Sequence, residues 1–338
     1  MRGAVIHAPG DVRYEERADP TIVEPTDAVI RTVAACVCGS DLWRYRGISS
    51  VPKPTPIGHE YVGVVEEVGS SVTSVRPGQF VVGGFLTSDN TCAVCRKGAL
   101  ANCLHRTGYD GCQAELIRVQ NADGTLIATP ETPADDLVPG ILSLSDVMCT
   151  GWHAAVSADV RPGSTVVVVG DGAVGLSGVL AASQLGAERI IAMSRHASRQ
   201  AIATDFGATH IVAERGDEGI AHVLDLTDGI GADSVLECVG TTESVTQALR
   251  AARPGGQVGW VGVPHDPEFP QQHMFWANVG LRGGPAPVRA YLPDLLERVW
   301  SRTIDPGRVF DLTLPLAEVA DAYAAMDERR AIKVLLQP

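Results

Sequence analysis

A run of β-branched residues that leads into a glycine-rich loop constrains the fold of this 338-residue chain more than any other feature. Thr165–Val169 reads TVVVV, which is typical of a strand buried on both faces of a parallel sheet. Residues 170–175 read GDGAVG, and an Ala/Leu-rich helix is expected from there to Leu185. A GxGxxG pattern is weak alone because the chain has 36 glycines. The strand before it and the helix after it are the context that dinucleotide binding requires.

Each glycine of the loop has a predicted role. We expect Gly170 to make the tight turn, Gly172 to let the backbone approach a pyrophosphate, and Gly175 to let the helix pack closely on the strand. Ala173 and Val174 open the helix, whose free N–H groups and dipole favour an anion. The alternative is a glycine turn that binds nothing.

The end of the next strand indicates which dinucleotide is bound. An NAD site needs a carboxylate about 20 residues after the loop, to accept from the ribose 2′-OH. Ser194 stands there instead, and Arg195 and Arg199 follow it. A carboxylate would repel a 2′-phosphate, whereas a Ser with basic neighbours binds one through charge-assisted hydrogen bonds. We therefore expect NADP rather than NAD; the alternative is that the two arginines form a solvated face.

Strands and helices alternate over residues 146–286, which predicts a doubly wound parallel sheet. Residues 1–145 instead read as short strands broken by Gly and Pro, which predicts an irregular β-rich domain. The tail at 287–338 is expected to return to that first domain, with a helix at 292–300 that has Pro293 in its first turn. The other expected elements are strands at 189–193, 211–212, 233–238, 257–263 and 331–336, and helices at 146–155, 196–206, 220–227, 243–252 and 316–326.

Composition excludes several classes of partner. The net charge of −13 argues against nucleic acid, which favours a basic face. The N-terminus lacks the apolar segment of a signal peptide, and no apolar run is long enough to span a bilayer. We therefore expect a cytoplasmic protein with no membrane partner. Its eight cysteines indicate metal ligands or free thiols rather than disulfides.

Two short stretches carry possible metal ligands. The first contains Cys38 and Asp41 in ACVCGSD, and His59 and Glu60 in PIGHE. Thiolate, imidazole and carboxylate are the ligand types of protein zinc sites. A catalytic zinc needs three protein ligands and one open position, so this stretch could supply two of them.

The second stretch, residues 89–103, reads DNTCAVCRKGALANC. Cys92, Cys95 and Cys103 have the spacing C-x2-C-x7-C, and Asp89 precedes Cys92 by the same interval of three. Thiolates three residues apart on a tight loop can converge on one tetrahedral zinc. Such a closed site stabilises the loop that carries it. His105 and Cys112 compete with Asp89 as the fourth ligand, and reduced cysteines without metal are the alternative.

Five motifs occur in order: CGSD at 38–41, GHE at 58–60, the cysteine-rich stretch, TGW at 150–152 and the GxGxxG loop. Together they resemble the zinc-dependent medium-chain dehydrogenases of the alcohol dehydrogenase family over essentially the whole chain. The resemblance implies an α/β fold, with a Rossmann dinucleotide-binding domain at 146–286 and a GroES-like catalytic domain at 1–145 and 287–338. It further implies hydride transfer between NADP(H) and an alcohol, aldehyde or ketone, a catalytic and a structural zinc (two per chain), and a homodimer or homotetramer.

The resemblance also implies a ligand set for the catalytic zinc. Cys38 and His59 match the family's ligands, and Asp146 stands four residues before the Thr-Gly pair, where many relatives have Cys. If Asp146 caps a helix instead, Cys149 and then Glu60 are the next candidates. Cys36 is a weaker rival to Cys38, because only Cys38 is followed by Gly-Ser-Asp.

The neighbouring polar residues resemble the family's proton path. Asp41 resembles the carboxylate that accepts from the ligating imidazole, and Ser40 the hydroxyl that passes the substrate proton onward. Glu60 is expected to approach the metal when the bound water leaves. Trp43 stands where many relatives have a His that ends the path, and an indole N–H only donates. The path must then end at the cofactor ribose, at water or at another base.

Two rival functions remain at this point: a zinc-free quinone or enone reductase of the same superfamily, and a sensor that holds NADP and zinc without turnover. The first generally lacks the Cys/His pair. The intact Ser40 and the open ligand set disfavour the second. The remaining residues expected at the cofactor are Thr150, Cys238, Val239, Gly262 and Val263.

Overall fold

The computed structural model describes residues 1–109 and 111–338. The chain divides into two compact units. Unit 1 comprises Met1–Asp146 and Pro287–Pro338, and unit 2 comprises Val147–Ala286. Each unit has its own sheet system and its own apolar core. Among the described residues, no helix combines the length and the apolar character needed to cross a bilayer.

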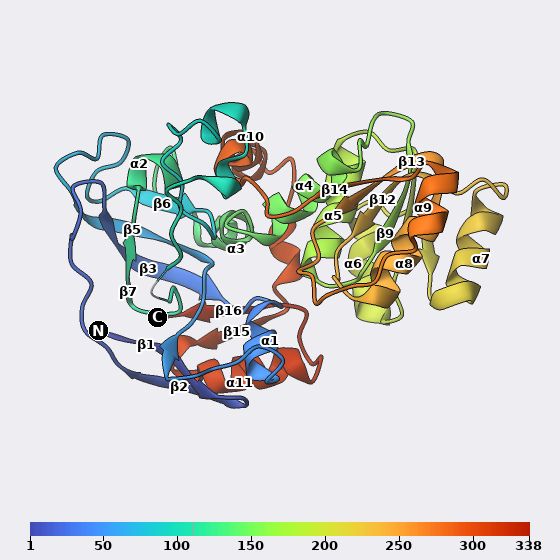
Figure 1. Ribbon diagram of the computed structural model, residues 1–338. Helices are drawn as coiled ribbons and strands as arrows, with labels where there is room; N and C mark the ends of the chain where they lie inside the picture. Colours follow the sequence, from blue (N-terminus) through green and yellow to red (C-terminus); the bar gives the residue numbers. More distant parts are fainter. Residues whose placement is uncertain (110) are drawn as a thin grey trace. The chain divides into compact units, whose positions relative to one another are not determined.

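Unit 2 contains the doubly wound parallel sheet that the sequence predicts. Its six strands lie in the order β11-β10-β9-β12-β13-β14, and every pair is parallel (Figure 1). The order reverses beside the central strand β9, where ligands bind at the carboxyl ends of such sheets. The strand bounds are β9 Thr165–Val169, β10 Arg189–Met193, β11 His210–Val212, β12 Ala232–Glu237, β13 Ala252–Trp260 and β14 Gly280–Gly283.

Helices cover this sheet in two groups. α4, α5 and α6 pack against one another, and α7, α8 and α9 form a second contiguous set. Val167 and Val169 of β9 belong to one core cluster with apolar residues of α7 and α8, as the alternation of side chains along a strand requires. The helix bounds are α4 Val147–Ser157, α5 Ala173–Gln184, α6 Ala197–Asp205, α7 Gly216–Leu226, α8 Thr242–Ala251 and α9 Gln271–Ala277.

Unit 1 is mainly β-structure, with helices between and after its strands. Its larger sheet has the order β15-β16-β3-β5-β6-β8, with β7 also paired to β3, and a smaller sheet has the order β2-β1-β4. The bounds are β1 Arg2–Ala8, β2 Asp11–Glu16, β3 Ala28–Cys36, β4 Thr55–Pro56, β5 Tyr61–Val68, β6 Phe80–Gly83, β7 Leu116–Val119, β8 Leu126–Ala128, β15 Leu312–Pro315, β16 Val334–Gln337, α1 Asp41–Tyr45, α2 Ala122–Thr125 and α3 Val138–Ser143.

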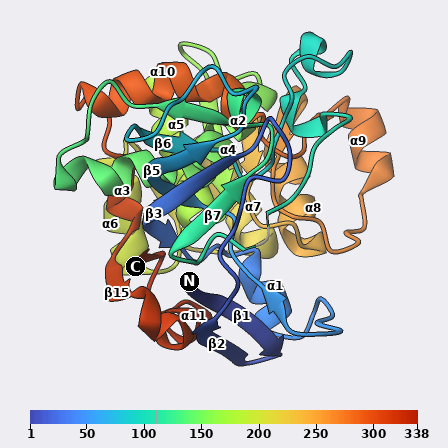
Figure 2. The same ribbon diagram turned by 90° about the vertical axis from the view of Figure 1, so that its left-hand side faces the viewer.

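The C-terminal tail completes unit 1. β16 pairs antiparallel with β3 next to Cys36, and α11 (Val319–Asp327) packs on the β1–β2 hairpin (Figure 2). The helix expected at 292–300 is α10 (Val288–Trp300), so the prediction that Pro293 lies in its first turn is wrong. The helix starts earlier because Val288 and Leu292 already belong to its buried face, and Pro293 lies inside it.

Candidate metal centres and cofactor site

Four ligand-type side chains of unit 1 converge on one point. Cys38 follows β3, His59 and Glu60 precede β5, and Asp146 directly precedes α4. One ligand atom from each lies within 4.8 Å of the others. The Cys38 Sγ and Asp146 Oδ2 atoms are 3.7 Å apart, and His59 Nε2 is 3.3 Å from the same oxygen. A tetrahedral zinc with bonds of about 2.0–2.3 Å separates its ligand atoms by about 3.3–3.8 Å, so the spacing fits.

The charges at this cluster also fit a cation. Burial raises the pKa of the Cys38 thiol, and the nearby Glu60 raises it further. Burial lowers the pKa of His59, but the charges of Asp41 and Cys38 outweigh that effect and hold it well above its usual value. The Oε2 atom of Glu60 is buried without a hydrogen-bond partner among the described residues. A divalent cation would compensate this excess of buried acceptors.

Asp41 lies directly behind His59, as predicted for the carboxylate that orients it. Its Oδ1 atom is 3.4 Å from His59 Nδ1, and its Oδ2 atom accepts from the Cys38 backbone N–H at 3.0 Å. Ser40 and Trp43 are both half-buried at the start of α1. The Cys36 and Cys149 rivals are not part of this cluster in the described part of the chain.

Lys333 is a residue of this region that the sequence analysis missed. Its Nζ donates to Glu60 Oε1 at 2.7 Å and to the Val37 carbonyl at 3.2 Å. Lys333 and Glu60 are both fully buried. The ion pair fixes the position of Glu60 beside the possible metal. A single lysine inside the apolar stretch AIKVLL was the only signal in the sequence.

The cysteine-rich stretch forms a second cluster. The ligand atoms of Asp89, Cys92, Cys95 and Cys103 lie within 4.8 Å of one another. The Asp89 Oδ1 atom is 3.4 Å from Cys95 Sγ and 3.3 Å from Cys103 Sγ, and the Cys92 and Cys95 sulfurs are 3.3 Å apart. Backbone hydrogen bonds lower the pKa of Cys92 to about 7. These distances fit a closed tetrahedral metal site.

The two competitors of Asp89 lie elsewhere. His105 is exposed, and its Nδ1 pairs with the Oδ2 atom of Asp89, so it orients the carboxylate from outside. Cys112 is fully buried in a separate apolar cluster with Tyr61. The structure therefore brings Asp89, and neither competitor, to the three thiols.

The glycine loop has an open, anion-accepting shape. Gly170 has φ +116°, which an L side chain rarely adopts, and a Cβ on Gly175 would lie 1.9 Å from the Gly170 carbonyl oxygen. A Cβ on Gly172 would meet no described protein atom within 4 Å. The space in front of Gly172, at the N-terminus of α5, thus suits a pyrophosphate.

Asp171, inside the same loop, reaches the predicted 2′ end of the cofactor site. Its Oδ2 atom accepts from the Ser194 hydroxyl at 2.9 Å, and its Oδ1 atom from Arg199 Nη1 at 3.1 Å. Burial raises the pKa of Asp171, but Arg199 and Ser194 outweigh that effect and lower it. Arg195 is exposed and donates its backbone N–H to the same carboxylate. Asp171 was not predicted from the sequence, because the intervening residues of a GxGxxG loop carry no expected role.

The turn that follows β12 lies beside the glycine loop, and the turn that follows β13 lies beside the β12 turn. A Cβ on Gly170 would be 2.8 Å from Val239 Cγ2 and 3.4 Å from Cys238 Cβ. The backbone N–H of Gly262 donates to the Glu237 carbonyl, and Val263 is half exposed beyond it. Thr150 is buried on α4. The predicted loop and turn residues therefore gather at the carboxyl edge of the sheet, where the ligand-binding crevices of such sheets form.

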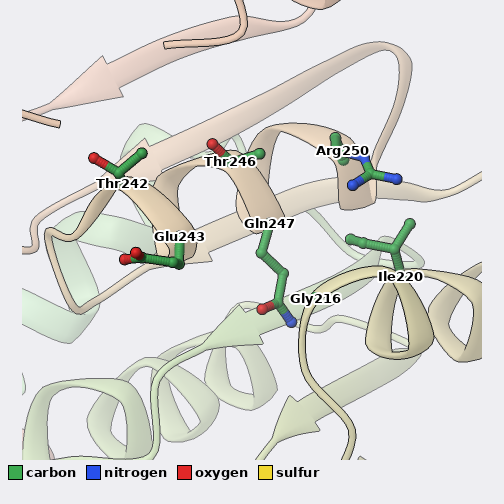
Figure 3. A pocket seen from close by; sticks show the side chains of 7 residues that line it. All are labelled: Gly216, Ile220, Thr242, Glu243, Thr246, Gln247 and Arg250. Atoms are coloured by element: carbon green, nitrogen blue, oxygen red, sulfur yellow. The ribbon is translucent and has the colours of Figure 1, made fainter. Parts of the chain in front are cut away.

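A separate hollow of about 280 Å³ lies between α7 and α8 (Figure 3). Gln247 points from α8 toward the start of α7 and donates to Met193 Sδ. Arg250 forms an ion pair with exposed Asp217. No metal-ligand cluster of the described residues lies in this hollow. Its lining residues are Gly216, Ile220, Thr242, Glu243, Thr246, Gln247 and Arg250.

Comparison with known proteins assigns the class. The alcohol dehydrogenase GroES-like domain family matches residues 24–131, and the zinc-binding dehydrogenase family matches residues 173–300. A probable zinc-binding alcohol dehydrogenase of Mycobacterium tuberculosis is 36% identical over 337 residues, which cover 97% of this chain and 86% of that protein. An NADP-dependent isopropanol dehydrogenase of Thermoanaerobacter brockii is 32% identical over 324 residues, 91% of each chain.

The solved structure of the alcohol dehydrogenase TADH from Thermus sp. ATN1 matches the fold with a TM-score of 0.92 at 34% identity, covering 100% of this chain and 99% of that one. The two matched domains define a zinc-binding dehydrogenase. The chain belongs to the zinc-dependent medium-chain alcohol dehydrogenase family. It is therefore an alcohol oxidoreductase of a family that uses zinc and a nicotinamide cofactor.

Proposed function

We propose that the protein transfers a hydride between NADP(H) and a small alcohol or its aldehyde or ketone, at a zinc held by Cys38, His59 and Asp146. The observation that carries this proposal is the convergence of a thiol, an imidazole and a carboxylate within 4.8 Å, with Asp41 behind the imidazole. These three ligands leave a coordination position for substrate. Glu60 lies beside them and would approach the metal only when the bound water leaves.

The residues of the chain have distinct roles in this reaction. When bound, the zinc supplies Lewis acidity and the nicotinamide accepts or donates the hydride. Asp41 accepts the Nδ1–H of His59 and thereby presents Nε2 to the metal. The Ser40 hydroxyl receives the substrate proton and passes it on. Trp43 cannot take that proton because an indole N–H only donates, so the path ends at the cofactor ribose, at water or at another base.

The preference for NADP rests on the side chains around the 2′ end. Ser194 replaces the carboxylate of an NAD site, and Arg195 and Arg199 supply positive charge beside it. The Thermoanaerobacter brockii relative is named as NADP-dependent. Asp171 pairs with Arg199, so a 2′-phosphate would share that arginine with a carboxylate. Exposed Arg195 is the cation that we propose meets the phosphate directly.

We propose that Asp89, Cys92, Cys95 and Cys103 hold a second, structural zinc. The four ligands leave no open position, and the site would pin the loop that carries them. Unit 1 would then be the catalytic domain and unit 2 the dinucleotide-binding domain.

We also propose a cytoplasmic homodimer or homotetramer. β14 is the edge strand of the described sheet and pairs with β13 on one side only. An unpaired strand edge favours association with another chain. Phe275 and Trp276, on the preceding helix α9, are 75% and 81% exposed. The eight cysteines form no disulfide among the described residues, which suits a reducing compartment.

A panel of primary and secondary alcohols, offered with NADP and NAD side by side, tests this function. We expect NADP-dependent oxidation that is lost on removal of zinc, and a raised NADP KM in Arg195→Ala. A zinc-free reductase would instead reduce enones without the metal, and a sensor would bind NADP without turnover. A preference for NAD, or an unchanged NADP KM in Arg195→Ala, would refute the cofactor assignment.

A further inference from the structure

Gln113 is a buried polar residue close to the proposed active site, with no role in the reaction as written above. Its side chain is 0% exposed. Its backbone N–H donates to the Ile57 carbonyl at 3.2 Å, and its carbonyl accepts from the Ala4 N–H at 2.7 Å. These bonds hold Gln113 against the segment that carries His59. The fit is close, because a Cβ on Gly58 would lie 2.6 Å from Gln113 Cγ.

The partners of the Gln113 amide determine its orientation. Nε2 lies 3.0 Å from the Cys36 carbonyl oxygen and 3.4 Å from Asp41 Oδ2, and both of these atoms only accept. The nitrogen must therefore face them, which leaves Oε1 to accept from the Tyr323 hydroxyl at 3.1 Å. Tyr323 lies on α11 and is also 0% exposed. The hydrogen-bond direction thus runs from Tyr323 through Gln113 to Asp41.

Asp41 transmits this constraint to His59. Two donors, the Cys38 backbone N–H and Gln113 Nε2, hold the Oδ2 atom of Asp41. The carboxylate is 7% exposed and cannot turn freely. Its other oxygen, Oδ1, is left facing His59 Nδ1. An imidazole that donates from Nδ1 presents a lone pair at Nε2, which is the atom nearest to Asp146 and Glu60.

We propose that Gln113 and Tyr323 are positioning residues for the catalytic metal: the tyrosine hydroxyl orients the amide, the amide orients Asp41, and Asp41 holds His59 in its ligating tautomer. This inference rests on the proposed function, in which His59 binds zinc. The three linked segments lie far apart in sequence, at residues 41, 113 and 323. The C-terminal helix α11 therefore contributes to a site formed by the first 146 residues.

Zinc release to the chelator 4-(2-pyridylazo)resorcinol tests the proposal on the purified holoprotein without measuring turnover. The release phase that His59→Ala abolishes is assigned to the catalytic site, and the phase that Cys103→Ser abolishes to the second cluster. We expect Tyr323→Phe and Gln113→Leu to accelerate the His59-dependent phase about 10-fold, since loss of outer-shell partners costs about 10–100-fold in metal affinity. The second phase should stay at its wild-type rate and serves as an internal control.

Tyr45→Phe is the matched control variant. The Tyr45 ring packs on Tyr323 at a centroid distance of 5.5 Å, but its hydroxyl makes no hydrogen bond to Gln113. It should release zinc at the wild-type rate in both phases. If Gln113→Leu does not fold, the zinc-release rate of Tyr323→Phe, which removes only one oxygen atom, tests the proposal by itself.

Two results would overturn the inference. One is a His59-dependent release rate that is unchanged in Tyr323→Phe. The other is an equal acceleration of both phases, which would indicate a general destabilisation of the fold. If His59→Ala abolishes neither phase in the first place, the proposed zinc site itself fails. That outcome is distinguishable, because it is read from a variant that leaves Gln113 and Tyr323 intact.

Discussion

Replacement of Lys333 by Met should strongly destabilise unit 1. The change keeps the length of the side chain but removes the ammonium group that lies 2.7 Å from Glu60 Oε1. Glu60 is 0% exposed and its second oxygen already lacks a partner among the described residues. Removal of one member of a buried ion pair costs about 3–5 kcal/mol, because the other charge is left uncompensated.

This cost predicts a measurable shift in thermal unfolding. In a unit of roughly 200 residues, each kcal/mol moves the melting temperature by about 2–4 °C, so Lys333→Met should lower it by about 6–20 °C. Differential scanning calorimetry of the holoprotein measures the shift. Lys53→Met is the control, because Lys53 is exposed and forms no ion pair among the described residues. It should melt within about 1 °C of the wild type.

A double variant separates the charge from the packing. In Lys333→Met with Glu60→Gln, no unpaired charge remains buried, so the loss should be smaller than in Lys333→Met alone. The reasoning is refuted if Lys333→Met and the Lys53→Met control have the same melting temperature. It is also refuted if Glu60→Gln destabilises the Lys333→Met protein as much as an independent substitution would.

Two further predictions follow from single carboxylates. Asp171→Asn should raise kcat/KM for NADP relative to NAD about 10-fold. The change frees Arg199 for the 2′-phosphate, and a hydrogen bond to a charged group is worth about 1.5–3 kcal/mol. A kcat/KM ratio that moves toward NAD would contradict the assignment of this pocket. Asp123 accepts from the backbone N–H groups and hydroxyls of Thr73 and Ser74. Burial raises its pKa, but these bonds outweigh that effect, and the folded pKa lies below the ordinary value. The stabilisation is therefore present above about pH 4 and lost as the pH falls through the folded pKa. Asp123→Asn should lower the free energy of unfolding by about 1–2 kcal/mol at pH 7, measured by urea unfolding. The difference in free energy of unfolding between this variant and the wild type should narrow below pH 4. A difference that widens there would contradict the direction of the pKa shift.

The elements that could be predicted from the sequence are those with a strong local pattern. β9 and β10 match the expected strands because short apolar runs rich in β-branched residues and bounded by turn residues leave few alternatives. α9 was not predicted, since none of its residues is fully buried and only Met274 and Ala277 of QQHMFWA pack against the apolar core, which is too few to give an apolar period. α10 begins earlier than the sequence predicts, because Pro293 is typical of a first helical turn, whereas the apolar spacing extends the helix to Val288.

The residues of the candidate site were likewise predictable only where the local sequence carries the signal. Cys38, His59 and Asp89 belong to short motifs, so the sequence alone predicts them as ligands, and each lies in a cluster of ligand-type atoms. Lys333 and Gln113 act through contacts that span 273 and 72 residues of sequence. Their partners come from tertiary folding, and no local pattern distinguishes them from ordinary core positions. A lone polar residue in an otherwise apolar stretch, as Lys333 in AIKVLL, is the sign that a sequence does offer.

The central claim is that Cys38, His59 and Asp146 hold a zinc distinct from the one at the cysteine-rich cluster. Elemental analysis of zinc per chain in the wild type and in His59→Ala tests it most directly. The account predicts about two zinc ions in the wild type and about one in His59→Ala, since each closed or open tetrahedral site binds a single ion. A wild-type chain with one ion or none, or a His59→Ala chain that retains two, would contradict it.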